Sequence, residues 1–220
     1  MAPGAAPPYR GPWARRPATH ELEGIMREQL AAVLEDDDAV IAEMVRDDAT
    51  TITEIDDHPL VGWRLLDVFW RGRAHPQRWY IALRPNHPQA VVLSGHPESW
   101  SSVIDEVVVH DASAACTLAV MHADLTRSMG ARFVRVESVD EIPFFPRPPE
   151  RAVRAIEAIR ESFADRITSP KVTGDGPWQV ELWTVTGETL VRHDVTVDRH
   201  GSVDDDQHVE VERLPVPMDL

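Results

Sequence analysis

The segment Asp-Gly-Pro-Trp-Gln-Val-Glu-Leu-Trp-Thr-Val-Thr-Gly-Glu-Thr-Leu-Val-Arg-His-Asp-Val-Thr-Val, residues 175–197, decides the fold of the C-terminal half. Apolar and polar residues alternate on both sides of Gly187-Glu188, as they do in half-buried strands. Glycine at the first loop position is typical of a two-residue type II′ turn. The segment therefore predicts a β-hairpin in which Thr186 lies opposite Thr189.

Counting outward from this turn divides the side chains of the hairpin between two faces, because the side chains of a strand alternate. The predicted pairs of the first, mainly apolar face are Trp178–Val197, Val180–Val195, Leu182–His193 and Thr184–Val191. The predicted pairs of the second face are Gln179–Thr196, Glu181–Asp194 and Trp183–Arg192. The register thus places one histidine on the apolar face and two opposed carboxylates on the other.

The bulk composition excludes several classes of protein. The 220 residues are 43% hydrophobic and carry a net charge of −15, so the chain can form a sizeable core and should repel nucleic acid and anionic membranes. No apolar run is long enough to span a bilayer, and the N-terminus lacks the apolar region of a secretory signal. Cys116 is the only cysteine, which fits a cytoplasmic protein without disulfides. Arginine outnumbers lysine by 21 to 1, which suggests a GC-rich bacterial genome.

The first 18 residues differ from the rest, because five prolines and two glycines make them a Pro-rich arm. Such an arm could reach a neighbouring subunit and so support a homo-oligomer. After it, the periodicity of apolar residues predicts helices and strands by range. Helices are expected over about 19–47 (one helix, or two short ones divided by Asp36-Asp37-Asp38), 97–107, 113–129 and 149–167. Strands are expected over 50–56, 62–71, 78–84, 89–94, 133–139, the hairpin and about 206–213, with a turn at 198–201.

Strands cluster between segregated helices in this order, which predicts an α+β fold with antiparallel sheets. A helix followed by antiparallel strands occurs twice, so we expect two modules, residues 19–110 and residues 111–220. Each module would pack its helix on a curved sheet. This outline resembles cystatin-like or NTF2-like domains, although no residue motif carries the resemblance.

His193 is the most informative candidate for catalysis. The register places it on the apolar face of the hairpin, where a histidine that titrates near neutral pH could act as a general base or acid. Asp67 or Asp194 could orient its ring. The alternative is a core histidine that bonds a carbonyl group and has no catalytic role.

The other carboxylates suggest less specific chemistry. Glu181 and Asp194 oppose each other, and a cation between them (Arg192, a partner's arginine or a metal) would relieve their repulsion. The alternative, which we favour, is an exposed face on which solvent screens both charges. The run Asp204-Asp205-Asp206 lacks the spacing of a calcium loop, and we expect it on a solvated edge strand. The sequence therefore predicts no metal site and no cofactor.

Six tryptophans follow the arm, and most of them should pack in the core. Trp183 and Arg192 on the second face form a pair with the composition of an interface hot spot, and Glu181 adds charge beside them. Cys116 and His122 are six residues apart on one expected helix, so they lie on different faces and make no local catalytic pair.

No nucleotide-binding, hydrolase, metalloprotease or thiol-redox motif occurs in the chain. The first functional hypothesis is therefore a non-catalytic binding or accessory protein. Such a protein would present a curved sheet and an acidic, Trp-bearing surface to a protein or peptide, or hold a small apolar molecule. The alternative is a small acid/base enzyme of the cyclase, isomerase or dehydratase type, with a sheet-lined pocket around His193.

Overall fold

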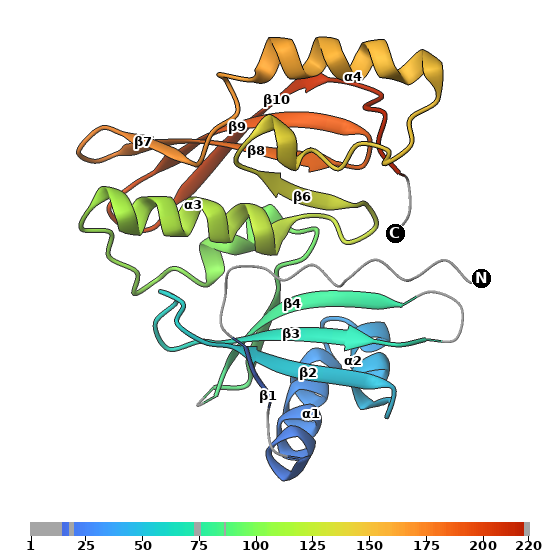
Figure 1. Cartoon of the computed structure of the whole chain (residues 1–220). Coiled ribbons are helices and arrows are strands. Elements are labelled where there is room, and N and C mark those ends of the chain that lie inside the picture. Colours follow the sequence, from blue (N-terminus) through green and yellow to red (C-terminus); the bar gives the residue numbers. More distant parts are fainter. Residues whose placement is uncertain (1–14, 18–19, 73–75, 86, 218–220) are drawn as a thin grey trace. The chain divides into compact units, whose positions relative to one another are not determined.

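The chain divides into two units, residues 1–92 and residues 93–220 (Figure 1). The computed structural model describes residues 15–17, 20–72, 76–85 and 87–217. Helices and antiparallel strands are segregated within each unit, which confirms the predicted α+β class. The sequence placed the boundary of the modules after residue 110, whereas residues 93–110 belong to the second unit.

The first unit contains an antiparallel sheet whose strands lie side by side in chain order. These strands are β1 (Arg15–Pro17), β2 (Thr50–Ile55), β3 (Arg64–Trp70), β4 (Gln77–Arg84) and β5 (Gln89–Val92). The last four confirm the predicted strands. Strand β1, which pairs with β2, lies within the expected Pro-rich arm. Residues 1–14 and 18 of that arm fall outside the described residues.

Helices α1 (His20–Leu34) and α2 (Ala39–Arg46) pack on one face of this sheet. The carboxylate of Asp38 accepts hydrogen bonds from the backbone N–H groups of Val40 and Ile41, so it caps α2. The core between helices and sheet is apolar; it includes Leu30, Ala42, Val45, Ile52, Leu66, Val68, Ile81 and Leu83. Of the two alternatives expected for residues 19–47, the structure confirms two helices rather than one.

The second unit is built on the predicted hairpin. Strands β8 (Trp178–Thr186) and β9 (Thr189–Val197) pair in the register expected from the sequence, from Thr186–Thr189 at the turn to Trp178–Val197 at the open end. Gly187 has a φ of +59°, and Glu188 is not among the described residues with positive φ. This combination agrees with the expected type II′ turn.

Strand β8 lies at the centre of the second sheet. One edge of β8 pairs with β9, and the other pairs with β6 (Phe133–Val136) near the turn and with β7 (Lys171–Thr173) near the open end. Beyond β9 lies β10 (Val203–Val211), which begins before the expected residue 206. The Asp198 carboxylate accepts hydrogen bonds from the backbone N–H groups of His200 and Ser202. These bonds close the predicted turn between β9 and β10.

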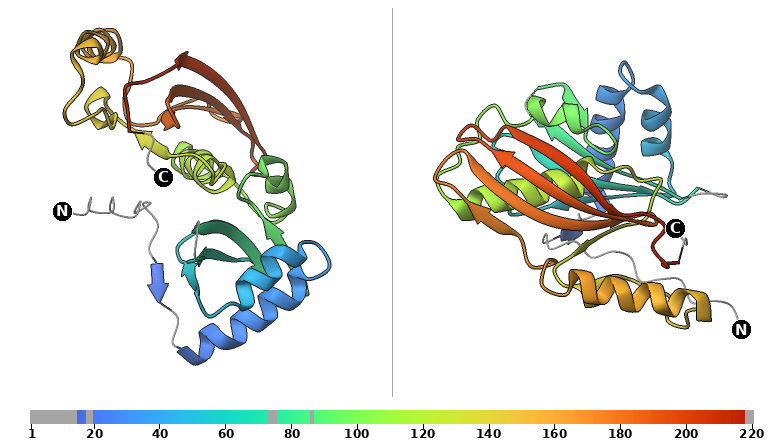
Figure 2. Two further views of the ribbon diagram at one scale, coloured as in Figure 1. Left: turned by 90° about the vertical axis from the view of Figure 1, so that its right-hand side faces the viewer. Right: turned by 90° about the horizontal axis from the view of Figure 1, so that it is seen from above.

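Both faces of this sheet are covered by helices, as the two sides of the sheet in Figures 1 and 2 show. Helix α3 (Ala112–Thr126) packs against the face that carries Leu182, which is fully buried. Helix α4 (Glu150–Phe163) packs on the opposite face, where the ring of Phe163 meets Trp183 edge-on at 5.9 Å between centroids. Two short 3-10 helices, η1 (Pro97–Ser102) and η2 (Val139–Glu141), complete the unit, and η1 is shorter than the predicted helix 97–107.

No helix in the described part of the chain combines the length and the apolar character that crossing a bilayer requires.

The layered packing makes the core of the hairpin sensitive to truncation. Replacing Leu182 by Ala should lower the free energy of unfolding by about 2–5 kcal/mol, because it removes a buried side chain beneath α3 and leaves a cavity. The control, Gln179→Ala on the exposed side of the same strand, should change it by less than about 0.5 kcal/mol. Urea unfolding followed by tryptophan fluorescence measures both. Equal losses for the two variants would show that the hairpin does not have this face buried.

Candidate functional site

His193 lies on β9 beneath α3 and is bonded through both ring nitrogens. Nδ1 lies 2.9 Å from the nearer carboxylate oxygen of Asp205, and Nε2 lies 2.9 Å from the hydroxyl oxygen of Thr184. The side chains of His193 and Asp205 are 5% and 6% exposed, so this contact is shielded from water. A carboxylate beside Nδ1 accepts a hydrogen bond from the Nδ1–H group and fixes the tautomer and orientation of the ring, as in hydrolase triads.

Asp205 reaches His193 because β10 continues the sheet beyond β9. The register pairs Gln207 with His193 and Asp205 with Val195, so Asp205 and Gln207 point to the same face as His193. The amide of Gln207 donates a hydrogen bond to Asp205. Burial by itself raises the pKa of Asp205, but the hydrogen bonds from His193 and Gln207 and the nearby charges of His193 and His122 together lower the pKa below its ordinary value. Asp205 is therefore ionised at neutral pH.

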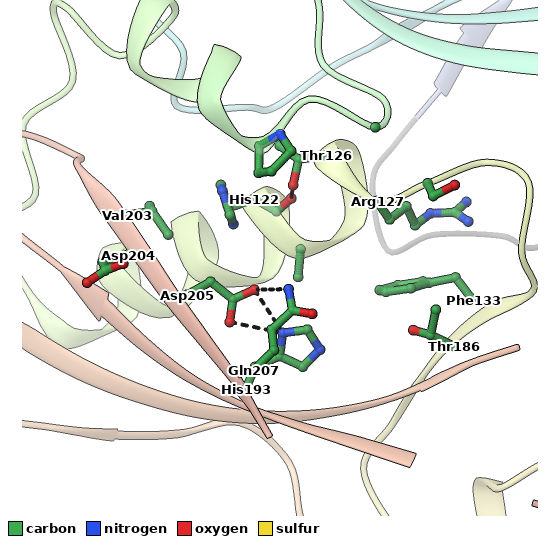
Figure 3. Close-up of a pocket in the computed structure, with 14 residues that line it drawn as sticks. His122, Thr126, Arg127, Phe133, Thr186, His193, Val203, Asp204, Asp205 and Gln207 are labelled. Atoms are coloured by element: carbon green, nitrogen blue, oxygen red, sulfur yellow. Dashed lines mark hydrogen bonds and ion pairs between the residues drawn. The ribbon is translucent and has the colours of Figure 1, made fainter. Parts of the chain in front are cut away.

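The Asp205–His193 pair lies on the wall of a cavity of about 550 Å³ within the second unit (Figure 3). The wall near the pair also carries His122 from α3, and the other end carries Arg127, Phe133 and Thr186. Asp204 also lines this cavity, but its carboxylate points away from His193 in Figure 3, and Asp205 is the carboxylate that contacts the ring. A volume of this size accommodates a small molecule.

His122 has a different hydrogen-bond state from His193. It is 4% exposed, and the ring of Trp100 meets it edge-on at 5.3 Å between centroids. The carbonyl oxygen of Pro97 accepts a hydrogen bond from the ring, whereas Nδ1 has no partner among the described residues. Burial lowers the pKa of His122, and although Asp205 opposes this effect, the net pKa lies below the ordinary value. His122 is therefore neutral at pH 7, and its Nδ1 is buried without a partner among the described residues.

The sequence identified His193 but not the carboxylate that orients it. Asp67 was expected as one partner; it lies on β3 in the first unit, where Arg78 binds it with an Nε–Oδ1 distance of 2.6 Å. Asp194 was expected as the other, but it lies on the opposite face from His193, 2.8 Å from Arg192. Both nitrogens of His193 are occupied by Asp205 and Thr184, so neither expected partner orients the ring.

The second face of the hairpin is ordered by an ionic network. Of the cations that the sequence offered, Arg192 lies between the two opposed carboxylates, 2.8 Å from Asp194 and 3.9 Å from Glu181, and it also binds Glu210 on β10. The expectation of an exposed Trp183 is wrong, because α4 covers that part of the face and leaves the residue 2% exposed. Trp183 is thus a core residue of the second unit rather than part of a surface.

The remaining candidates do not form a second centre in the described residues. Cys116 lies on α3, and burial raises the pKa of its thiol, which favours the unreactive protonated form. No group of three histidine, cysteine, aspartate or glutamate side chains within the described ranges is placed to hold a metal ion. The chemistry of the second unit is therefore concentrated around His122, His193 and Asp205.

Two residues of the site were missed by sequence reasoning. Asp205 belongs to a run of three aspartates, and nothing in the sequence distinguishes it from the other two. Only the register of β10 shows that it is the one on the face of His193. The sequence placed His122 near the buried stripe of its helix and weighed it as a partner of Cys116, but did not identify it as a site residue. Its position three residues before Leu125 and four after Leu118, both buried, was the available signal that its ring enters the core.

Comparisons of the chain with protein-family models, with curated protein sequences and with solved structures find no match.

The state of His122 predicts a pH-dependent stability. Because its pKa is lowered in the folded protein, the unfolded chain takes up the proton first as the pH falls below about 6.5, and the folded state loses stability until its own pKa is passed. His122→Gln places a polar amide at this position that does not titrate, so its free energy of unfolding should fall less between about pH 7 and pH 5. Urea unfolding at several pH values gives both curves.

His58 in the first unit also has a pKa lowered by burial, and it contributes equally to both proteins. Asp205 acts in a separate and lower window, because its lowered pKa supplies stability that is lost only below about pH 3.8. A constant difference between the two proteins across pH 5–7 would contradict the assignment of His122 as a buried neutral base.

Proposed function

We propose that the cavity of the second unit is the active site of an acid/base enzyme that acts on a small polar molecule. The observation that carries this proposal is the Asp205–His193 pair on the cavity wall, in which a buried carboxylate orients an imidazole. Reactions of the isomerase, cyclase or dehydratase type need mainly such proton transfer.

His193 can exchange protons with the cavity through two hydroxyl groups. Its Nε2 contacts the hydroxyl of Thr184, which lies 3.5 Å from the hydroxyl of Thr186 on the cavity wall. The second contact is long, as catalytic hydrogen bonds often are before a substrate tightens them. A proton that leaves a substrate at Thr186 would thus reach Nε2, while Asp205 stabilises the positive charge that develops on the ring.

The partner-binding hypothesis has weaker support. It relied on an exposed Trp183 and an open sheet face, and in the second unit α3 and α4 cover both faces of the sheet. The cavity also carries hydroxyl, amide and carboxylate groups, which suit a polar ligand better than an apolar one.

The test compares the purified protein with two variants in a mixture of small polar metabolites. The protein should convert at least one compound to an isomer or to a product that differs by one water. His193→Gln should slow that conversion by about 10²–10⁴-fold, because it removes the proton-transfer group. Thr186→Val should slow it as well, because it interrupts the hydroxyl path. Mass spectrometry and NMR of the mixture follow both reactions.

The matched control is His200→Gln, which makes the same substitution at an exposed position in the β9–β10 turn. It should retain the full rate. Conversion that survives His193→Gln, or a protein that converts nothing in the mixture, would refute the proposed chemistry.

A further inference from the structure

Arg127 supplies the positive charge on the wall of the cavity. Of the described residues that line the cavity, it is the only arginine or lysine, and it lies with Phe133 and Thr186 at the end away from Asp205 (Figure 3). The hydroxyl path from His193 reaches the cavity at the same end, at Thr186. A group bound by Arg127 would therefore lie near the proposed point of proton transfer.

Two contacts hold the guanidinium of Arg127 in place. Its Nε donates a hydrogen bond to the carbonyl oxygen of Asp124 on α3, 3.0 Å away, and its central carbon lies 4.9 Å from the centroid of the Phe133 ring. Phe133 on β6 is paired with Thr186 on β8, so both side chains lie on the same face of the sheet. A guanidinium fixed in this way loses little rotamer freedom when it binds an anion.

The carboxylates of the cavity make no comparable demand for a charged ligand. Asp205 is 6% exposed in its side chain and accepts hydrogen bonds from His193 and Gln207, so its charge is already compensated within the protein. Asp204 is exposed, and solvent screens its charge. Recognition of a charged ligand in this cavity therefore depends mainly on Arg127.

Three head groups can be compared at this wall. A primary ammonium is repelled by Arg127, and the burial of Asp205 shields that carboxylate from it. A hydroxyl can accept one hydrogen bond from Arg127 without compensating its charge. A carboxylate can accept two parallel hydrogen bonds from a guanidinium and cancels the charge, which makes it the strongest of the three partners. His122 does not change this order, because it is neutral and its Nδ1 is buried beyond the reach of a ligand.

A singly charged anion suits this place better than a doubly charged one. Arg127 directly follows α3, and the carbonyl groups at the C-terminal end of a helix carry partial negative charge. The carbonyl oxygens of Thr126 and Arg127 accept a hydrogen bond from Gly95, so they are satisfied, but they still repel anions. A phosphate monoester carries nearly two charges at neutral pH, and one guanidinium would leave part of that charge uncompensated beside them.

We propose that the cavity binds a small carboxylic acid as its anion, with the carboxylate on the guanidinium of Arg127 and the adjoining carbon atoms toward Thr186. This inference rests on the proposed function in one respect, because a bound acid becomes a substrate only if the path from Thr186 to His193 moves its proton. The net charge of −15 repels anions at a distance, so the affinity depends on the contact with Arg127.

Four probes of similar chain length test the head group: butyrate, n-butanol, butylammonium and n-propyl phosphate. Each is titrated into the full-length protein while the backbone amide signals of Arg127, Phe133 and Thr186 are followed by NMR. Butyrate should shift these signals and bind about tenfold more tightly than n-butanol, which is the gain expected from charge-assisted hydrogen bonds. Butylammonium should bind most weakly, and n-propyl phosphate less tightly than butyrate.

Variants assign the binding to Arg127. Arg127→Gln should weaken butyrate about tenfold and leave n-butanol unchanged, because it removes the charge. Arg127→Lys should recover part of the affinity, since it keeps the charge but loses the planar pair of donors, and a merely structural role would not produce this order. The matched control is Arg154→Gln, the same substitution at an exposed position of α4, which should keep the affinity. If Arg127→Gln perturbs the amide signals along α3, the four probes on the unchanged protein still decide the head group.

The outcomes separate this inference from the proposed function. Any of the other three probes binding as tightly as butyrate overturns the carboxylate, and so does butyrate binding that Arg127→Gln leaves unchanged. Loss of conversion in His193→Gln would still support the enzyme in either case. Conversely, His193→Gln should bind butyrate within about twofold of the unchanged protein, so a failure of the proposed chemistry leaves the binding test intact.

Discussion

The site depends on the register of the β8–β9 hairpin, because the register decides which face of the sheet each side chain occupies. Side chains alternate along a strand, so a register shifted by one residue would move His193 from beneath α3 to the face that α4 covers. Gly187 fixes this register through the conformation of its backbone in the turn. A Cβ atom at this position would meet no other atom within 4 Å, so the positive φ of +59° alone requires glycine. One turn residue thus determines which side chains can reach the cavity.

Local information of this kind explains why much of the second unit could be predicted. A two-residue loop sets the register of the hairpin without reference to any other part of the chain, so the face of His193 followed from the sequence. Asp205 could not be found in this way. Its face depends on where β10 begins after the Asp198 turn, and the sequence suggested a start at residue 206, whereas the strand begins at Val203.

The wrong expectation that Trp183 is exposed has a related cause. Arg192 and Glu181 suggested a solvated face, and polar pairs do occupy its open end. Near the turn, however, Val185 and Leu190 face each other on the same side as Trp183, and both are fully buried. These two residues were the signal that a helix packs there. The sequence does not say which of its amphipathic helices supplies the cover, because that choice depends on contacts between distant segments.

In this unit, a candidate site differs from ordinary packing in whether its buried polar atoms have hydrogen-bond partners. A buried histidine with both nitrogens bonded, such as His193, is compatible with a purely structural role, because its burial is compensated. His122 is not compensated, and an apolar side chain of similar size in its place would avoid the cost of the unpaired nitrogen. That cost falls on a residue that lines the cavity beside an ionised carboxylate. Natural proteins accept such local losses of stability mainly where binding or catalysis requires them. His122, whose Nδ1 has no partner among the described residues, is therefore the stronger argument for function. His193, whose nitrogens are both bonded, becomes informative because it lines the same cavity.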